Sequence, residues 1–159
     1  MAKASIKSIA QTEKAGLFSI CFEGESYTEF QKFFNKFKDD AIFSEELQTI
    51  LAALKHMMEN AGFLERRFRP EGKMRDDVCA IPLETCKLRL YCLRLSDSVL
   101  IAGNGGVKNS RTYNENEELT GYVVTLQKLD EAIQVAIRKG EVTIEEKTIN
   151  GVESKMFEL

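Results

Sequence analysis

The basic residues between Leu64 and Tyr113 are the side chains of this sequence whose types and spacing could do chemistry. This stretch carries ten Lys and Arg against six Asp and Glu, a net charge of +4, whereas the rest of the chain carries twelve against nineteen, a net charge of −7. Arginine binds phosphate through two parallel hydrogen bonds, and lysine binds it as a point charge. A basic stretch inside a chain of net charge −3 therefore predicts a local anion-binding surface.

Most of these cations lie where a folded chain could bring them to one face. They are Arg66, Arg67, Arg69, Lys73 and Arg75 in a loop before a strand, Arg89 within a strand, and Lys108 and Arg111 after the next strand, with Tyr113 close behind. In an antiparallel meander, a loop that enters one strand can face the exit of another. Taken singly, Arg66 or Arg67 is better explained as a solvated loop residue. Arg89 lies among apolar neighbours, so it needs either a carboxylate partner such as Asp76 or Asp77 or a wet functional groove.

Other kinds of site find little support in the sequence. His56 is the sole histidine and is distant from any cysteine, which argues against a hydrolytic triad and against zinc ligation. No cofactor and no metal are predicted. The four cysteines form no C-x-x-C pair and are expected to be reduced, mostly buried thiols: Cys21, Cys79, Cys86 and Cys92. The glycines at 103, 105 and 106 lack P-loop spacing and are expected to form a bulge or tight turn, with backbone approach to a sugar-phosphate as the alternative.

Hydrophobic periods predict the elements that position these side chains. Alternating apolar residues predict a strand over 17–23, whereas 1–15 shows no period and is expected to form a loose arm. Two amphipathic helices follow. Phe30, Phe33, Phe34 and Phe37 mark the first, with Thr28 or Ser26 as its N-cap. The second begins near Ser44, which is expected to cap it, and Gly62 is the expected C-terminal cap.

Three strands and a third helix complete the predicted body. The strands are expected at 78–83, at 87–95 and from 99 to 102, with an irregular continuation at the glycines. A polar connection over 114–121 precedes a helix that runs from about Leu126 to Gly140, and Asn150-Gly151 predicts a terminal hairpin over about 141–158. The first strand is expected to pair with the meander and the helices to cover one face, which gives an α+β sandwich.

Length and composition fit one domain over residues 1–159. The hydrophobic fraction is 43% and the charged fraction 30%, both ordinary for a globular protein. No apolar run approaches the roughly 18–20 residues needed to span a bilayer, and the first residues lack the apolar core of a signal peptide. We therefore expect a cytoplasmic protein with no membrane partner.

The element order and three short motifs resemble the RelE/ParE toxin superfamily, and most of all its phage-derived, HigB-like branch. The motifs are Gly72-Lys73-Met74-Arg75 before the sheet, Leu88-Arg89-Leu90-Tyr91 in the central strand, and Val107-Lys108 after the next strand. The resemblance covers residues 17–140. It implies a RelE-like α+β fold, with an N-terminal strand and helical hairpin packed on an antiparallel β-meander, and a C-terminal helix. Residues 141–159 are then a C-terminal hairpin extension.

The resemblance also implies a function. The chain would be the toxin of a type II toxin–antitoxin system, a ribosome-dependent mRNA endonuclease that inhibits translation. Its partners would be the ribosome, mRNA and a cognate antitoxin, for which a helix-turn-helix protein is one candidate. Carried over by position, the implied catalytic residues are Lys73, Arg75, Arg89, Lys108 and Tyr113, and the implied RNA-binding residues are Arg66, Arg67, Arg69 and Arg111. In such chemistry the substrate 2′-OH attacks the adjacent phosphorus and leaves a 2′,3′-cyclic phosphate.

The sequence departs from the family pattern in ways that keep a second function open. The chain is acidic, it has no histidine of catalytic type, and Asn104-Gly105-Gly106 replaces ordinary strand residues. The alternative is a non-catalytic RelE-fold binding or regulatory protein that acts through protein–protein contacts. Growth inhibition without RNA cleavage would indicate that alternative.

Overall fold

A computed structural model of the protein describes residues 2–71, 78–81, 87–108 and 117–159. The order is β1 (Lys3–Gln11), β2 (Gly16–Phe22), α1 (Glu29–Phe37), α2 (Ser44–Glu59), the 3-10 helix η1 (Glu65–Arg67), β3 (Arg69–Pro70), β4 (Val78–Ala80), β5 (Leu88–Arg94), β6 (Val99–Val107), α3 (Glu117–Arg138), β7 (Thr143–Glu145), β8 (Thr148–Asn150) and β9 (Phe157–Glu158). The strands β3-β4-β5-β6-β2-β1-β9 form one sheet in that order, and β7-β8 form a separate hairpin. The predicted α+β class is therefore confirmed.

The sheet is mixed. Strands β4, β5 and β6 form the predicted antiparallel meander, and β2 joins it by parallel pairing with β6, with Gly16 opposite Val99 and Ser19 opposite Ala102. Parallel neighbours need a long crossover, and here the α1–α2 pair and the first strands of the meander supply it. The first part of the chain does not form a loose arm, because β1 pairs antiparallel with β2 over most of its length.

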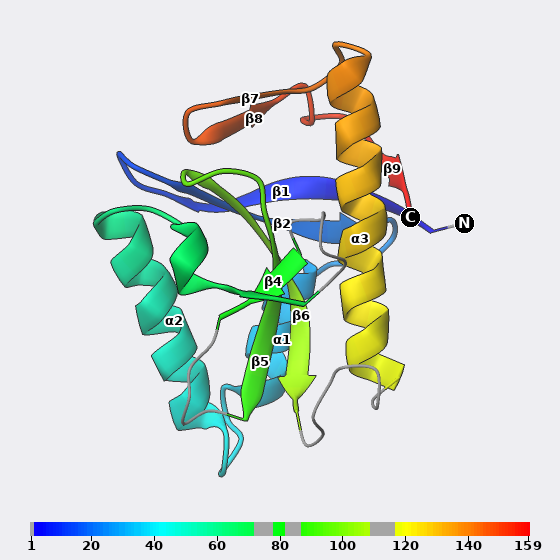
Figure 1. The fold of residues 1–159 in the computed structure, drawn as a ribbon. Helices are drawn as coiled ribbons and strands as arrows, with labels where there is room; N and C mark the ends of the chain where they lie inside the picture. The colour runs from blue at the N-terminus through cyan, green and yellow to red at the C-terminus, as the bar shows by residue number, and fades with distance from the viewer. Residues whose placement is uncertain (1, 72–77, 82–86, 109–116) are drawn as a thin grey trace.

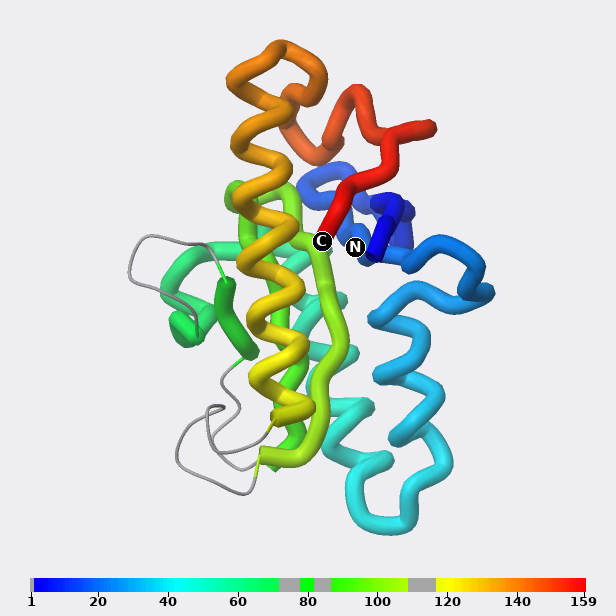
Figure 2. Tube along the Cα trace, turned by 90° about the vertical axis from the view of Figure 1, so that its right-hand side faces the viewer, coloured from blue at the N-terminus to red at the C-terminus, as the bar shows by residue number. Residues whose placement is uncertain are grey.

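Helices cover both faces of the sheet, so the expectation of helices on one face is wrong. Helices α1 and α2 lie behind the sheet and α3 lies in front of it (Figures 1 and 2). Alternate residues of β5 separate accordingly: Leu88, Leu90 and Cys92 pack toward α1 and α2, while Tyr91 and Leu93 pack toward α3. Hydrophobic periodicity shows which side of a helix is buried, but it does not show which face of the sheet the helix covers.

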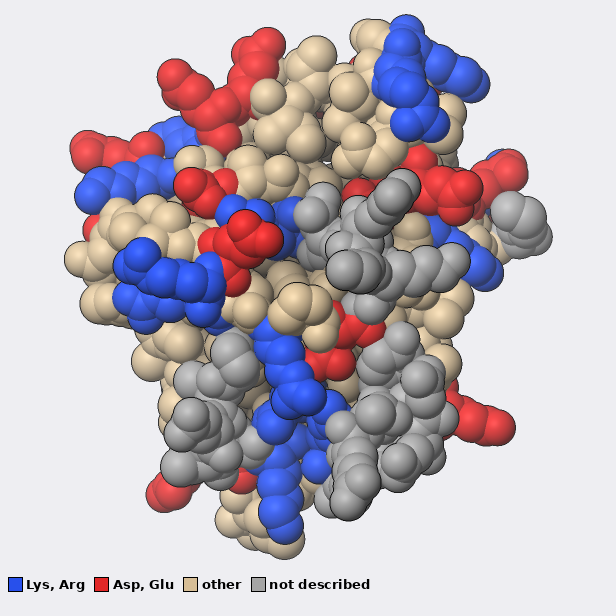
Figure 3. Space-filling model, viewed as in Figure 1, with Lys and Arg blue, Asp and Glu red and all other residues tan. Residues whose placement is uncertain are grey.

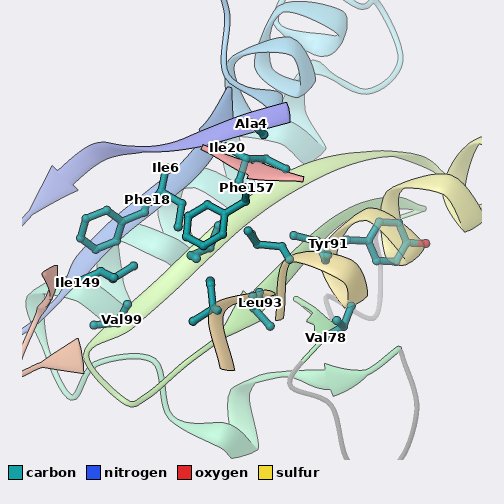
Figure 4. Close-up of a cluster of buried hydrophobic side chains, with 14 of the residues drawn as sticks. Ala4, Ile6, Phe18, Ile20, Val78, Tyr91, Leu93, Val99, Ile149 and Phe157 are labelled. Atoms are coloured by element: carbon teal, nitrogen blue, oxygen red, sulfur yellow. The ribbon is translucent and has the colours of Figure 1, made fainter. Parts of the chain in front are cut away.

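The core on the α3 side joins residues from both ends of the chain. Ala4, Ile6, Phe18, Ile20 and Phe157 lie next to one another in this cluster (Figure 4). Strand β9 pairs with the start of β1, where Ala4 lies opposite Phe157. The terminal segment therefore adds the edge strand β9 to the sheet and also contains the β7–β8 hairpin.

Helix ends and turns differ from the prediction in detail. Thr28 caps α1 in a full capping box with Gln31, as predicted. Helix α2 does begin at Ser44, but Ser44 is its first residue and not its cap: Phe43 is at the N-cap position, with no capping side-chain hydrogen bond, and Asp40 accepts the backbone N–H groups of Ile42 and Phe43 in the preceding turn. Gly62 has φ +91° after the helix, in keeping with its predicted role as a terminator.

The C-terminal part also differs. Helix α3 begins at Glu117, inside the segment expected to be a polar connection. The terminal hairpin exists, but Glu146 and Lys147 form its turn, and Glu146 has φ +51°. Asn150 ends β8, so the Asn150-Gly151 pair does not form the hairpin turn.

Three glycines and a β-bulge shape the second half of β6. Leu90 pairs with Gly105 and Cys92 with Ala102, so Gly103 and Asn104 both lie opposite Tyr91. The register shift confirms the irregular continuation. A side chain at position 103 would meet Leu126 of α3 at 3.1 Å, and one at position 105 would meet the backbone oxygen of Arg89 at 1.9 Å. The glycines therefore let α3 and the neighbouring strand approach β6 closely.

Candidate functional site

The charges of three predicted cations act on one buried carboxylate, and we call these four residues the basic cluster: Arg69, Arg89, Lys108 and Glu71. Glu71 is only 6% exposed, and the Nε atom of Arg69 lies 3.8 Å from its Oε1. The charges of Lys108, Arg69 and Arg89 all act on Glu71. A run of Lys and Arg side chains crosses the front of the molecule over the lower ends of β5 and β6 (Figures 1 and 3).

Strand pairing places these four residues on two ladders of the sheet. Arg69 lies opposite Ala80 in the β3–β4 ladder, and the backbone N–H of Glu71 donates to the carbonyl of Val78. Arg89 lies on β5 opposite Gly106, and the backbone N–H of Lys108 donates to the carbonyl of Lys87, which prolongs the β5–β6 ladder. Arg89 and Lys108 thus lie at the paired ends of β5 and β6, whereas Arg69 and Glu71 lie on and beside β3 at the edge of the sheet.

Burial shifts the pKa values of two groups of the basic cluster in opposite directions. Loss of hydration raises the pKa of the Glu71 carboxyl, although the nearby charges of Lys108, Arg69 and Arg89 lower it in part. Loss of hydration lowers the pKa of the Lys108 ammonium, which the charge of Glu71 opposes. Both groups therefore move toward neutral pH, where a proton acceptor and a proton donor work best.

The Glu71 carboxylate also keeps acceptor capacity. Within the described residues, its Oε1 atom is buried and accepts no hydrogen bond. Buried polar atoms without partners are rare in folded proteins, and they often mark a place where a further group binds. Two arginines beside such an oxygen supply planar, bidentate donors for phosphate.

The remaining predicted site residues are placed as follows. Arg66 and Arg67 lie in η1 and are exposed, in keeping with solvated loop residues. Arg89 is half-buried, and its Nη1 donates to the carbonyl of Leu88 at 3.1 Å. Several predictions lie outside the described residues: Lys73, Arg75, Arg111 and Tyr113 as site residues, Asp76 and Asp77 as partners of Arg89, and Cys86 as a buried thiol.

Sequence reasoning missed Glu71. It stands in a charged run, Arg69-Pro70-Glu71-Gly72-Lys73, where nothing in the local pattern separates a buried carboxylate from a solvated one. The signal available was the return of the chain through Val78 to Ala80, which pairs β3 with β4 and places Glu71 beside Val78. That pairing is a tertiary event, so only a hairpin prediction across 69–80 could have found it.

Metal and membrane sites find no support in the described part of the chain. No group of three or more His, Cys, Asp and Glu side chains there could hold a metal ion. No helix there is long and apolar enough to cross a bilayer. Cys79 and Cys92 are buried free thiols, and burial holds the pKa of Cys92 well above its usual range.

Comparisons with known proteins leave the basic cluster as the main evidence about function. No family model matches the chain, no curated protein matches it, and no solved structure matches it.

Proposed function

We propose that this protein is a RelE-like toxin that binds RNA through the basic cluster and cleaves mRNA at the ribosome. The observation that carries the proposal is the buried Glu71 carboxyl, which lies 3.8 Å from the Nε atom of Arg69 and also feels the charges of Arg89 and Lys108. It combines phosphate-binding cations with two groups that can move protons. Apart from β1 and β3, the element order up to α3 follows the strand–helix–helix–meander order on which the family resemblance rests.

In the proposed reaction, Glu71 takes the proton of the substrate 2′-OH, and the 2′-oxygen attacks the adjacent phosphorus. The bond to the 5′-oxygen of the next nucleotide breaks, and this oxygen takes a proton from the ammonium of Lys108. The products are a 2′,3′-cyclic phosphate and a 5′-hydroxyl end. The arginines stabilise the charge that develops on the phosphoryl oxygens. Burial raises the pKa of the Glu71 carboxyl, which suits this group to take up a proton.

The test is induced expression in a bacterium, with growth, bulk translation and mRNA 5′ ends measured together. We expect growth arrest and new 5′-hydroxyl ends. Arg89→Ala should abolish both, because it removes a phosphate ligand. The matched control is Arg138→Ala, which removes an exposed arginine from the last turn of α3 and should leave both unchanged. If Arg89→Ala and Arg138→Ala behave alike while both proteins fold, the basic cluster is not the site.

A second variant separates chemistry from binding. Glu71→Gln keeps the shape of the side chain but cannot accept the proton, so cleavage should fall by about 10²–10⁴-fold while RNA binding persists. Cleavage at the wild-type rate would exclude Glu71 as the base. Growth arrest of the wild type without any new RNA ends would instead support a non-catalytic binding protein that uses the same surface. Absence of arrest by folded protein would contradict the toxin proposal.

A further inference from the structure

A second polar pocket lies at the edge of β6, between α1 and α3, and shares no residue with the basic cluster. Strand β2 pairs with β6 only as far as Ala102, so residues 103–107 extend beyond it. Helices α1 and α3 flank this part of β6 on opposite sides (Figures 1 and 2). The pocket has a volume of about 560 Å³ and is lined by Tyr27, Glu29, Lys32, Asn35, Lys36, Asn104 and Tyr122. This size is within the usual range for small-ligand sites.

A buried amide faces this pocket. Asn104 is 5% exposed and lies two residues after Ala102, which packs on the α1–α2 side, so its side chain also lies on that side. The Nδ2 atom of Asn104 donates to Oε1 of Glu29 over 3.4 Å, a long hydrogen bond, and its Oδ1 accepts from the backbone of Gly105. The amide therefore keeps one N–H for a further acceptor.

Glu29 is a buried carboxylate on the opposite wall. Its side chain is 9% exposed, and Oε2 forms an ion pair with Lys32 at 2.6 Å. Lys32 also pairs with Glu25, so it keeps a partner when Glu29 binds something else. The serine hydroxyl of Ser19 accepts the backbone N–H of Phe30 and fixes this end of α1 on the sheet. Glu29 is therefore held in place beside the pocket.

On the far wall of the pocket, Lys36 and Tyr122 already form hydrogen bonds within the protein. Lys36 donates to the carbonyl of Gly105 at 2.8 Å and to the hydroxyl of Tyr122 at 3.0 Å, and Tyr122 donates to Glu118 at 2.6 Å. Burial lowers the pKa of Lys36. With Lys32 neutralised by Glu25 and Lys36 beside Glu118, the pocket has no large excess of either charge. Because both lysines are already ion-paired, an anionic ligand would lose its hydration without gaining an unpaired cation, which favours a neutral polar ligand.

The groups that stay available in the pocket, Glu29, Asn104 and Tyr27, fit a flat ring with hydrogen-bonding edges. A carboxylate offers two adjacent acceptors, which match two adjacent N–H donors, and guanine carries such a pair at N1 and N2. The free N–H of Asn104 can donate to a ring oxygen or nitrogen. Tyr27 is 54% exposed at the same pocket, and an exposed phenol ring can stack on a base.

We propose that this pocket binds a nucleobase and prefers guanine, with Glu29 and Asn104 contacting its edge and Tyr27 its face. The base can come from a free nucleoside or from an RNA strand. Binding of the free nucleoside does not depend on the proposed cleavage, because no group of the basic cluster takes part. Binding of a base within RNA would deepen the proposed function by giving it a sequence preference.

The experiment is titration of the full chain with guanosine, adenosine, cytidine and uridine, followed by calorimetry or by chemical-shift changes. We expect guanosine to bind most tightly. Glu29→Gln should weaken guanosine binding roughly ten-fold or more, because the amide can accept only one of the two donors. Tyr27→Ala should weaken it by a similar factor without affecting folding, because Tyr27 is exposed. Glu59→Gln, on the exposed surface of α2, is the matched control and should change nothing.

Short RNA strands with and without one guanine distinguish the two sources. A guanine-containing strand that binds more tightly than guanosine, and loses that advantage in Arg89→Ala, indicates a base within RNA. Equal binding of strand and nucleoside, unaffected by Arg89→Ala, indicates a free guanine compound. The proposal is overturned if no nucleoside binds, if the four bind equally, or if Glu29→Gln and Tyr27→Ala bind guanosine like the wild type. None of these results depends on whether the protein cleaves RNA.

Discussion

At Glu71, burial and neighbouring charge act in opposite directions on one carboxyl group. The net result is a pKa raised above its ordinary value of 4.5. The folded chain therefore holds this proton at pH values where the unfolded chain has released it. Stability contributed by Glu71 is present at low pH and is lost as the pH rises from 4.5 through the raised folded value.

Glu71→Gln should remove that pH dependence. We expect the free energy of unfolding of the variant to improve relative to the wild type as the pH rises from about 4 to 7. Urea unfolding at several pH values measures the difference. Glu65→Gln, an exposed neighbour in η1, is the control and should show a smaller trend. A variant that instead loses stability relative to the wild type with rising pH would show that ion pairing outweighs burial at this site.

At the scale of elements, the bulge in β6 depends on a glycine that no other residue can replace. A Cβ atom at position 105 would lie 1.9 Å from the backbone oxygen of Arg89, which cannot move aside without breaking the ladder. Gly105→Ala should therefore lower the free energy of unfolding by about 1–3 kcal/mol. Gly121→Ala is the control, because a Cβ there meets nothing within 4 Å and alanine favours the α3 helix by roughly 0.5–1 kcal/mol. Similar effects of the two changes in urea unfolding would contradict this account.

The N-terminus of α1 holds Glu29 through its cap. The hydroxyl of Thr28 accepts the backbone N–H of Gln31, and the side chain of Gln31 accepts the backbone N–H of Thr28. Thr28→Ala should cost about 0.5–2 kcal/mol of stability. Thr49→Ala on the exposed face of α2 should change stability by less than about 0.5 kcal/mol. Thermal or urea unfolding compares the two, and equal losses would mean that the capping box contributes nothing specific.

The elements that could be predicted are those with strong local periods. The phenylalanine spacing in α1 and the alternation in β5 follow directly from sequence. Strand β1 could not be read in this way, because the shift between Ser8 and Ala10 breaks its two-residue period. The position of Glu71 depends on the pairing of β3 with β4, and the pocket at Asn104 depends on the packing of α1 against β6, and a local hydrophobic period predicts neither contact.

At the scale of the whole molecule, different elements pack on the two faces of the sheet. One face holds the α1–α2 pair, and the other holds α3 together with residues from both chain ends. The basic cluster and the pocket beside Asn104 both include residues at or just after the last part of β6, which α3 covers through Leu119 and Leu126. A change that loosens the α3 face should therefore affect both sites, although neither site contains residues of the terminal segment.

Phe157 gives a test of this coupling. Its ring is 3% exposed in the α3-side core, and its strand β9 closes the sheet on β1. Phe157→Ala should lower the free energy of unfolding by about 3–5 kcal/mol, because it leaves a cavity and frees the sheet edge. Met156→Ala, at the preceding residue, which is 40% exposed, should lower the free energy of unfolding far less. Hydrogen exchange of the β1 and β6 amides should rise in Phe157→Ala and not in Met156→Ala. If exchange rises in β1 alone, the terminal strand protects only its neighbour, and the two sites on β6 are held independently of it.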